Sequence, residues 1–248
     1  KRYFYWEHTR VMIFKLICLF TFPVFATVKV TTTLPDLAWL VKAVGQKEVE
    51  VEALLSEKDN PHYVEAVPLF IQRAAEADLV VSAGLELESA WLPKILERTG
   101  KASIQVGGIN YLELGTVVSV LEKPSGPVDR SMGDVHPSGN PHFWLSPLQF
   151  SSTVPLVVEN LSRLVPASKT EFEKNGKKLQ KTFTEIYKRN KGKLKNKVKV
   201  LEYHREFTYF LKDYGFENTG SLEEKPGFPP SLGHILKLAN FAKASQVK

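Results

Sequence analysis

The sequence contains a single cysteine, Cys18, among its 248 residues. Cys18 lies in an apolar N-terminal run that we expect to be removed from the mature chain. Its removal would exclude any disulfide within that chain. A metal site made by the mature chain would therefore use only nitrogen and oxygen ligands, because no thiolate would remain.

The sequence also lacks the motifs of several functional classes. It has no G-x-G-x-x-G fingerprint and no P-loop, which argues against nucleotide chemistry. The formal net charge is +6, but four basic residues and one acidic residue within 1–26 supply half of it. The charge of +3 that remains on residues 27–248 is mild and argues against a dedicated nucleic-acid-binding protein.

An apolar run near the N-terminus is typical of a targeting segment. From Met12 the chain reads MIFKLICLFTFPVFA, with one lysine and a small residue, Ala26, at its end. The run is too short to span a bilayer, and it resembles a cleavable secretory signal peptide more than a buried first strand. The residues just before Cys18 lack the small residue that lipid attachment prefers, so we expect cleavage. We predict that residues 1–26 are an upstream extension plus signal peptide, and that the mature protein is periplasmic.

Strand-like and helix-like segments alternate from residue 27 onward. Predicted strands cover 27–33, 47–55, 78–84 and 101–108, and predicted helices cover 35–45, 65–76 and 88–100. The first helix has proline at its start and glycine at its end. The apolar run 78–84 is typical of a buried parallel strand. This alternation predicts an α/β fold with a parallel sheet and helices on both of its faces.

The alternation stops after about residue 110. A loop rich in proline and glycine leads into a predicted helix at 146–165. Apolar residues then recur at helical spacing, which predicts one long helix from about 168 to 192. Two further strand–helix units follow it. Lysines crowd the long helix, but no aromatic residues interleave with them on an exposed surface, so we interpret them as a solvated face.

This order predicts two α/β lobes, each with a parallel sheet flanked by helices. The N-terminal lobe is expected at 27–167, the linker helix at 168–195 and the C-terminal lobe at 196–248. The chain stops at Lys248, where a further strand is expected. We therefore predict that the C-terminal lobe is truncated and continues in the intact gene product.

Three histidines come from three loops at the ends of predicted strands and helices. His62 follows the second strand, His142 precedes the helix at 146–165, and His204 ends the first strand of the C-terminal lobe. Ligands of open α/β sheets bind outside the carboxyl ends of the strands. Each histidine alone would be unremarkable in a loop or a core, but three that converge on one crevice predict a metal site. Three neutral imidazoles would leave one coordination position of Zn²⁺ open.

Two of these histidines share the frame Asn-Pro-His-aromatic, at 60–63 and 140–143. Proline restricts the backbone before each imidazole and lowers the entropy cost of fixing it. Phe143 and Trp144 would either wall the site or only pack nearby. His136 is expected to hold its loop in place or to contact metal weakly, and His234 is expected to cap or pack.

The sequence resembles the metal-specific substrate-binding proteins of zinc and manganese ABC transporters, the cluster A-I family. The resemblance covers essentially all of 27–248. It rests on the stretches TLPDLAWL, NPHYVE, ADLVVSAGLELESAWLPKIL, GDVHPSGNPHFWLSP, YHREFTYFLKDYGF and KPGFPPSLGHILKL. It implies two lobes bridged by a rigid helix, metal ligands at His62, His142 and His204, and delivery of the ion to a membrane permease.

This chain departs from the family pattern at two points. Ser146 stands where many relatives have aspartate, and serine caps a helix equally well. The fourth ligand of the family would lie beyond Lys248 and is unknown here. Relatives with histidine at the third ligand position are grouped with zinc transport, and nitrogen donors favour Zn²⁺ over Mn²⁺. We expect a monomer that carries zinc, with manganese as the weaker candidate.

Two other functions compete with metal transport. A zinc-dependent hydrolase could also use three histidines and a water, with Glu65 or Glu206 as general base. The sequence has no H-E-x-x-H pattern, and Glu206 is expected to face solvent at a helix start, so we predict no enzymatic activity. The second alternative function is that of a surface adhesin modulated by metal, and no motif in the sequence supports it.

Overall fold

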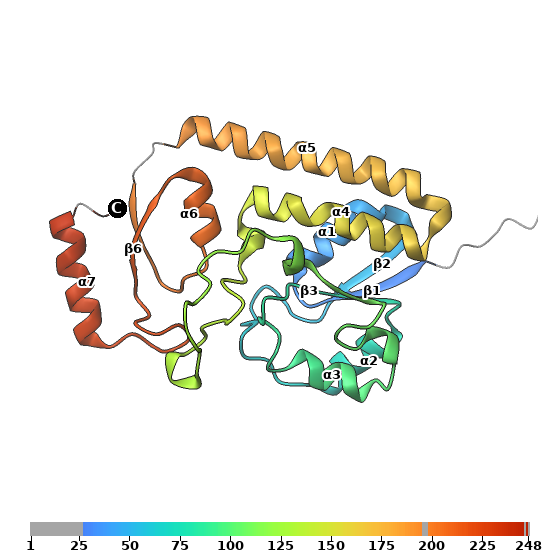
Figure 1. The fold of residues 1–248 in the computed structure, drawn as a ribbon, viewed down its shortest axis with the longest axis horizontal. Coiled ribbons are helices and arrows are strands. Elements are labelled where there is room, and N and C mark those ends of the chain that lie inside the picture. Colours follow the sequence, from blue (N-terminus) through green and yellow to red (C-terminus); the bar gives the residue numbers. More distant parts are fainter. Residues whose placement is uncertain (1–26, 195–197, 246, 248) are drawn as a thin grey trace, which may run out of the picture.

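Two parallel sheets organise the computed structural model, which describes residues 27–194, 198–245 and 247 (Figure 1). The larger sheet has four strands in the order β2-β1-β3-β4, and all its neighbours run parallel. The strands are β1 (Val28–Thr32), β2 (Val49–Ala53), β3 (Leu79–Ser82) and β4 (Tyr111–Glu113). Because β1 leads to β2 on one side and the chain then returns to β3 on the other, a topological switch point lies between β1 and β3.

Helices cover both faces of this sheet, as predicted. In Figure 1, α1 (Pro35–Gly45) and α4 (Pro147–Leu164) lie on one side of the strands, and α2 (Pro68–Glu76) and α3 (Leu92–Arg98) lie on the other. All four residues of β3 are buried, which is the mark of a strand covered on both faces. At the start of α4, the Ser146 side chain accepts a hydrogen bond from the Gln149 amide, so the expected cap is confirmed.

The strand predicted at 101–108 is wrong. That segment forms a short 3₁₀ turn, Ala102–Ile104, and the fourth strand comes later as β4. Gly107 has φ +79°, and the Gly108 amide donates to the Gln105 carbonyl at 2.7 Å. A left-handed residue that closes a tight turn cannot continue a strand. The β-branched and apolar residues of this stretch therefore led to a wrong prediction.

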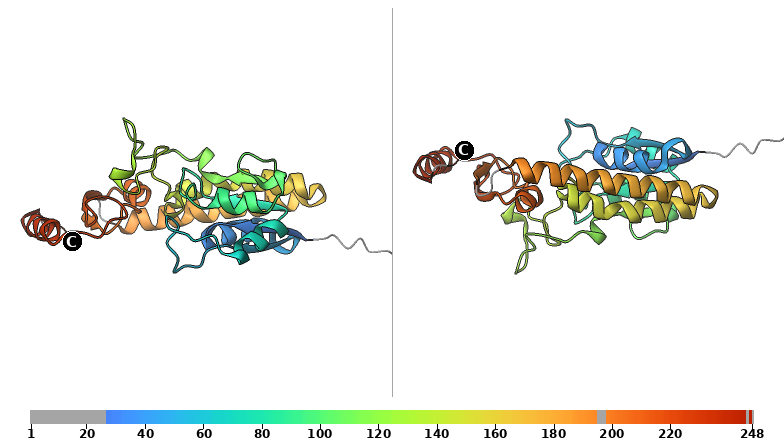
Figure 2. Two further views of the ribbon diagram at one scale, coloured as in Figure 1. Left: turned by 90° about the horizontal axis from the view of Figure 1, so that it is seen from below. Right: turned by 90° about the horizontal axis from the view of Figure 1, so that it is seen from above.

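The long helix expected after α4 is α5 (Lys169–Lys193). It packs along α4 and α1, and it continues toward the second sheet (Figures 1 and 2). Its buried residues Phe172, Gly176, Leu179 and Phe183 form one face, because their spacing follows the helical repeat. The Asn175 amide donates to the Val44 carbonyl at 3.0 Å and fastens α5 to α1.

The second sheet consists of β5 (Lys199–Glu202) and β6 (Glu217–Ser221), which run parallel. Helix α6 (Thr208–Tyr214) connects the two strands, and α7 (Leu232–Ser245) follows β6. The predicted fold class, with two parallel sheets flanked by helices and a long helix between them, is confirmed. On α7 only Leu238 is buried, while Leu232, Leu236 and Phe241 are exposed. The division into lobes and the continuation past Lys248 stay predictions.

The predicted signal peptide, including Cys18, lies outside the described residues. Among the helices that the structure does describe, none combines the length and the apolar character that a bilayer span requires.

Candidate metal centre

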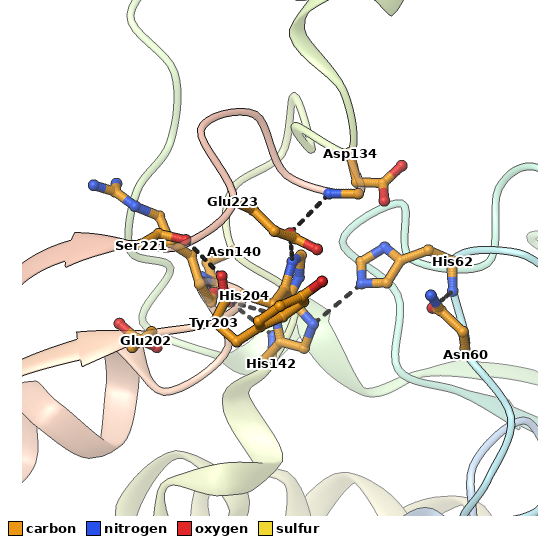
Figure 3. Close-up of polar contacts among 12 residues, drawn as sticks. Asn60, His62, Asp134, Asn140, His142, Glu202, Tyr203, His204, Ser221 and Glu223 are labelled. Atoms are coloured by element: carbon orange, nitrogen blue, oxygen red, sulfur yellow. Dashed lines mark hydrogen bonds and ion pairs between the residues drawn. The ribbon is translucent and has the colours of Figure 1, made fainter. Parts of the chain in front are cut away.

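Three imidazoles meet at a crevice between loops that follow strands of the two sheets (Figure 3). One ring nitrogen from each of His62, His142 and His204 lies within 4.8 Å of the others. The Nε2 atoms of His62 and His142 are 3.3 Å apart. Two nitrogens bound to a tetrahedral Zn²⁺ at ~2.0–2.1 Å stand roughly 3.3 Å from each other. The structure thus brings together the three predicted histidines at a spacing that suits one zinc ion.

The ring of His142 is oriented by the asparagine two residues before it. The His142 Nδ1–H donates to Asn140 Oδ1 at 3.0 Å, and the same oxygen accepts from the His142 backbone amide. The amide group of Asn140 cannot be turned around, because its nitrogen donates to the Arg205 carbonyl at 2.8 Å and to Glu122. The proton of neutral His142 therefore sits on Nδ1, and Nε2 presents its lone pair to the ion.

His204 follows β5 and is oriented by a carboxylate. Its Nδ1 lies 2.8 Å from Glu223 Oε2 (Figure 3). Glu223 also accepts the Gly227 amide at 2.9 Å, which fixes the carboxylate in the loop after β6. A carboxylate that holds Nδ1–H leaves Nε2 free and makes the imidazole a stronger donor toward metal. Glu223 carries no sequence signal that would identify it, because its proximity to His204 arises only when β6 pairs with β5.

His62 is held through the loop that follows β2. The Asn60 side chain accepts the His62 amide at 3.0 Å, which repeats the arrangement of Asn140 and His142. The buried indole of Trp91 donates to the Pro61 carbonyl at 2.9 Å and ties this loop to the core. The repeated Asn-Pro-His frame therefore has a structural basis, with asparagine closing an Asx turn and proline restricting the backbone between them.

The two aromatic residues after His142 have different positions. Phe143 is fully buried and belongs to the hydrophobic core, so it packs rather than walls the crevice. The ring of Trp144 lies 5.4 Å from the ring of His142, centre to centre, and Trp144 borders the crevice. Phe143 therefore packs in the core and Trp144 lies at the wall of the crevice, which are the two roles that the sequence left open.

Burial keeps the imidazoles of His62 and His142 neutral. It lowers the pKa of His62 to about 3, with further lowering from the nearby charges of protonated His136 and His204. Burial also lowers the pKa of His142 well below its ordinary value, and the neighbouring histidines add to the effect. A neutral imidazole is the form that binds metal. The crevice therefore holds at least two histidines in the metal-binding form at neutral pH.

The lowered pKa values predict that the metal-free protein loses stability in mild acid. The unfolded chain protonates His62 and His142 near pH 6.5 and the folded chain does not, so the unfolded state binds more protons below that pH. Stability should be greatest above about pH 6.5 and fall toward pH 3, by at most about 1.4 kcal/mol per pH unit for each histidine. Urea unfolding at pH 5 and pH 7 with a chelator present would measure this.

The matched variant for this measurement is His142→Gln, which removes one titrating group. Its stability should change less between pH 5 and pH 7 than that of the wild type. A wild-type stability that is the same at both pH values would show that the buried histidines are not held neutral.

Cavities of about 450 Å³ and about 420 Å³ adjoin the trio, and His142 and His204 line both. His136 and His234 line the first, and His62, Trp144 and Glu206 line the second. Glu206 was expected to face solvent, which is wrong, because it is partly buried beside the histidines and burial raises its pKa. Glu65 is exposed and borders neither cavity.

The chain is similar to metal-binding proteins of known type. It is 26% identical over 226 residues to the zinc-binding lipoprotein AdcA of Streptococcus pneumoniae, which covers 88% of this chain and 43% of AdcA. It is 28% identical over 216 residues to the zinc-binding protein TroA of Treponema pallidum, which covers 86% of this chain and 65% of TroA. This chain thus spans less than two thirds of the length of either relative.

A solved structure has a similar fold. The substrate-binding protein FpvC of Pseudomonas aeruginosa in complex with Mn²⁺ superposes with a TM-score of 0.73 and 26% identity, over 90% of this chain and 79% of FpvC. A family model described as "ZnuA: Zinc-uptake complex component A periplasmic" matches residues 30–248, which is most of the chain. The chain therefore belongs to the ZnuA family of zinc-uptake components.

Proposed function

We propose that the chain is the extracytoplasmic substrate-binding component of a metal ABC transporter. It captures one Zn²⁺ ion with His62, His142 and His204 and delivers the ion to a membrane permease. The observation that carries this proposal is the meeting of three imidazoles from three separate loops, with Nε2 atoms of two of them 3.3 Å apart. Membership of a zinc-uptake family and the zinc-binding relatives support it.

Zinc is the favoured cargo because the ligand set described so far is all nitrogen. Imidazole suits Zn²⁺, whereas Mn²⁺ prefers carboxylate and carbonyl oxygens. Manganese and iron relatives exist, since the chain is 25% identical to a manganese ABC transporter lipoprotein of Streptococcus mitis and 23% identical to an iron ABC transporter lipoprotein of Streptococcus pyogenes. Discrimination among these ions is therefore the property that most needs measurement.

The arrangement suits capture and release better than catalysis. Each ligand arrives on a different loop, and two of these loops belong to one sheet while His204 belongs to the other. A small relative motion of the two sheets would separate the ligands and release the ion. Glu206 borders the same cavity as the three histidines and could serve a hydrolase as general base, but membership of a zinc-uptake family argues against the hydrolase and adhesin alternatives. We expect the protein to act as a monomer at the outer face of the membrane.

The test is metal analysis of the protein purified without added metal, followed by competition between Zn²⁺ and Mn²⁺. We expect one ion per chain and tighter binding of zinc than of manganese, as nitrogen donors imply. Equal binding of both ions, or several weak ions per chain, would contradict the proposal.

A further inference from the structure

The chain passes from the larger sheet to the smaller one at a single point, where α5 leads into β5. All other contacts between the two sides are therefore non-covalent, and a motion that releases the ion must break or shift some of them. Beside the histidines, these contacts centre on Asn140, which is 8% exposed and lies in the loop before α4. Asn140 is thus placed where a relative motion of the two sheets would be felt.

The side chain of Asn140 bonds to both sides of the crevice. Its Oδ1 atom accepts the backbone amide and the Nδ1–H of His142, each at 3.0 Å (Figure 3). Its Nδ2 atom donates to the Arg205 carbonyl at 2.8 Å and to Glu122 Oε2 at 3.0 Å. Arg205 directly follows His204 in the sequence. One amide group therefore joins a ligand on one side to the neighbour of a ligand on the other.

The main chain of Asn140 is held by the same region of the second sheet. The Tyr209 hydroxyl, from α6, donates to the Asn140 carbonyl at 2.6 Å and accepts the Leu121 amide at 3.3 Å. The Asn140 amide in turn donates to the Leu121 carbonyl at 2.9 Å. Tyr209 is 1% exposed and belongs to the core of the larger sheet, although its helix follows β5. Asn140 is therefore tied to the second sheet through both its side chain and its backbone.

These bonds link the position of the sheets to the orientation of a ligand. If the sheets move apart, Asn140 loses its bonds to Arg205 and Tyr209, and its amide group becomes free to turn. The acceptor that holds the proton of His142 on Nδ1 is then no longer fixed. Buried hydrogen bonds that exist only in the closed arrangement raise the free energy of opening, and so they reduce the population from which the ion can leave.

We infer that Asn140 is a positioning residue that couples the relative position of the two sheets to the orientation of His142, and that this coupling slows the release of zinc. The inference rests on the proposed function and concerns the regulation of the same site. Asn140 acts through His142 and makes no contact with the ion itself.

The second Asn-Pro-His frame provides a matched reference. Asn60 accepts the His62 amide at 3.0 Å, just as Asn140 accepts the His142 amide. Asn60 is exposed, and in the part of the chain that the structure describes its amide nitrogen donates no hydrogen bond. The exchange of asparagine for aspartate therefore has the same local chemistry at both positions, but only at position 140 does it remove a donor to the second sheet.

Asn140→Asp separates orientation from coupling. The carboxylate still accepts the Nδ1–H of His142 and makes the imidazole a stronger donor to metal, so a residue that only oriented the ring would keep zinc at least as well. The carboxylate cannot donate to the Arg205 carbonyl, and it faces Glu122. We expect zinc release about tenfold faster than in Asn60→Asp, the effect of one lost buried hydrogen bond. The association rates should agree within about threefold, because such changes act mainly on dissociation.

Tyr209→Phe tests the same junction without any change to the frame. It removes one hydroxyl and leaves the side chain of Asn140 in place. Zinc release should become about threefold faster or more, for the same reason. Stopped-flow transfer of zinc to a fluorescent chelator would measure the rates in the wild type and the three variants. Urea unfolding with a chelator present would show that each variant is folded.

Release from Asn140→Asp that is no faster than from Asn60→Asp would overturn the coupling and leave the proposed function standing. A wild-type release rate in Tyr209→Phe would also overturn it, even if Asn140→Asp releases zinc faster. Tyr209→Phe alone decides if Asn140→Asp does not fold. A wild type that binds no zinc would overturn the proposed function itself, which the affinity of the unsubstituted protein reveals before any variant is made.

Discussion

Alanine at position 142 is expected to weaken zinc binding by about a hundredfold or more. Structural zinc sites bind with ~10–16 kcal/mol shared among four ligands, so one ligand contributes about 3 kcal/mol, which is about a hundredfold in affinity. His142 is the most buried of the trio, at 4% exposure, and its ring is held by Asn140. Water can replace a lost exposed ligand easily, but a buried and oriented nitrogen is harder to replace.

His62→Ala and His204→Ala should produce losses of the same order, because each contributes one nitrogen to the same group. His234→Ala is the control, since its ring nitrogen is bonded to a backbone carbonyl and it lies outside that group. Competition with a zinc chelator would measure the four affinities. Losses below about threefold in the trio, or an equal loss in His234→Ala, would contradict the assignment of ligands.

The three candidate ligands could be predicted because the relevant information is local. Each histidine lies in a loop that follows a strand or leads into a helix, and strand ends are recognisable from apolar runs such as 79–82. The Asn-Pro-His frame likewise acts over three residues, through a hydrogen bond that the histidine amide donates to the asparagine side chain. The spacing of apolar residues was also sufficient to predict α5, since a long helix with one buried face depends on that spacing alone.

The residues that orient the ligands could not be predicted, because they act across long sequence separations. Glu223 reaches His204 only after β6 pairs with β5, and Trp91 reaches Pro61 only after α3 packs under the sheet. Composition gives no signal for either contact. The strand at 101–108 was predicted wrongly for a local reason. Its β-branched and apolar residues suggested a strand, but its two glycines permit a tight turn.

Glu88 was not predicted from the sequence, and it occupies the topological switch point between β1 and β3. It is 3% exposed, although glutamate is rarely buried. Its Oε1 accepts the Thr33 hydroxyl at 2.7 Å and the Ala83 amide at 2.8 Å, and its Oε2 accepts the Gly84 amide at 3.0 Å. Open α/β sheets commonly bind ligands at this point, and here a side chain of the protein fills it.

These contacts stabilise a strained turn that leads toward the metal site. Gly84, Leu85 and Glu86 all have positive φ, of 80°, 52° and 68°, which is unfavourable for the two non-glycine residues. The turn carries the chain to Trp91, whose indole donates to the Pro61 carbonyl next to His62. Burial raises the pKa of Glu88, and the hydrogen bonds from Thr33 and the two amides oppose that rise.

Glu88→Ala is therefore expected to destabilise the protein by about 3–5 kcal/mol, a large share of the ~5–15 kcal/mol typical of a folded domain. The substitution leaves two buried amides and the Thr33 hydroxyl without an acceptor, at about 1–3 kcal/mol for an unpaired group, and opens a cavity.

Glu88→Gln keeps one oxygen for Thr33 and Ala83 and should cost only about 1–2 kcal/mol. Glu185→Ala, on the exposed face of α5, should stay within about 0.5 kcal/mol of the wild type. Urea unfolding of the three variants would measure these differences. A loss below about 1 kcal/mol in Glu88→Ala would mean that the turn and the strand ends hold their geometry without this carboxylate.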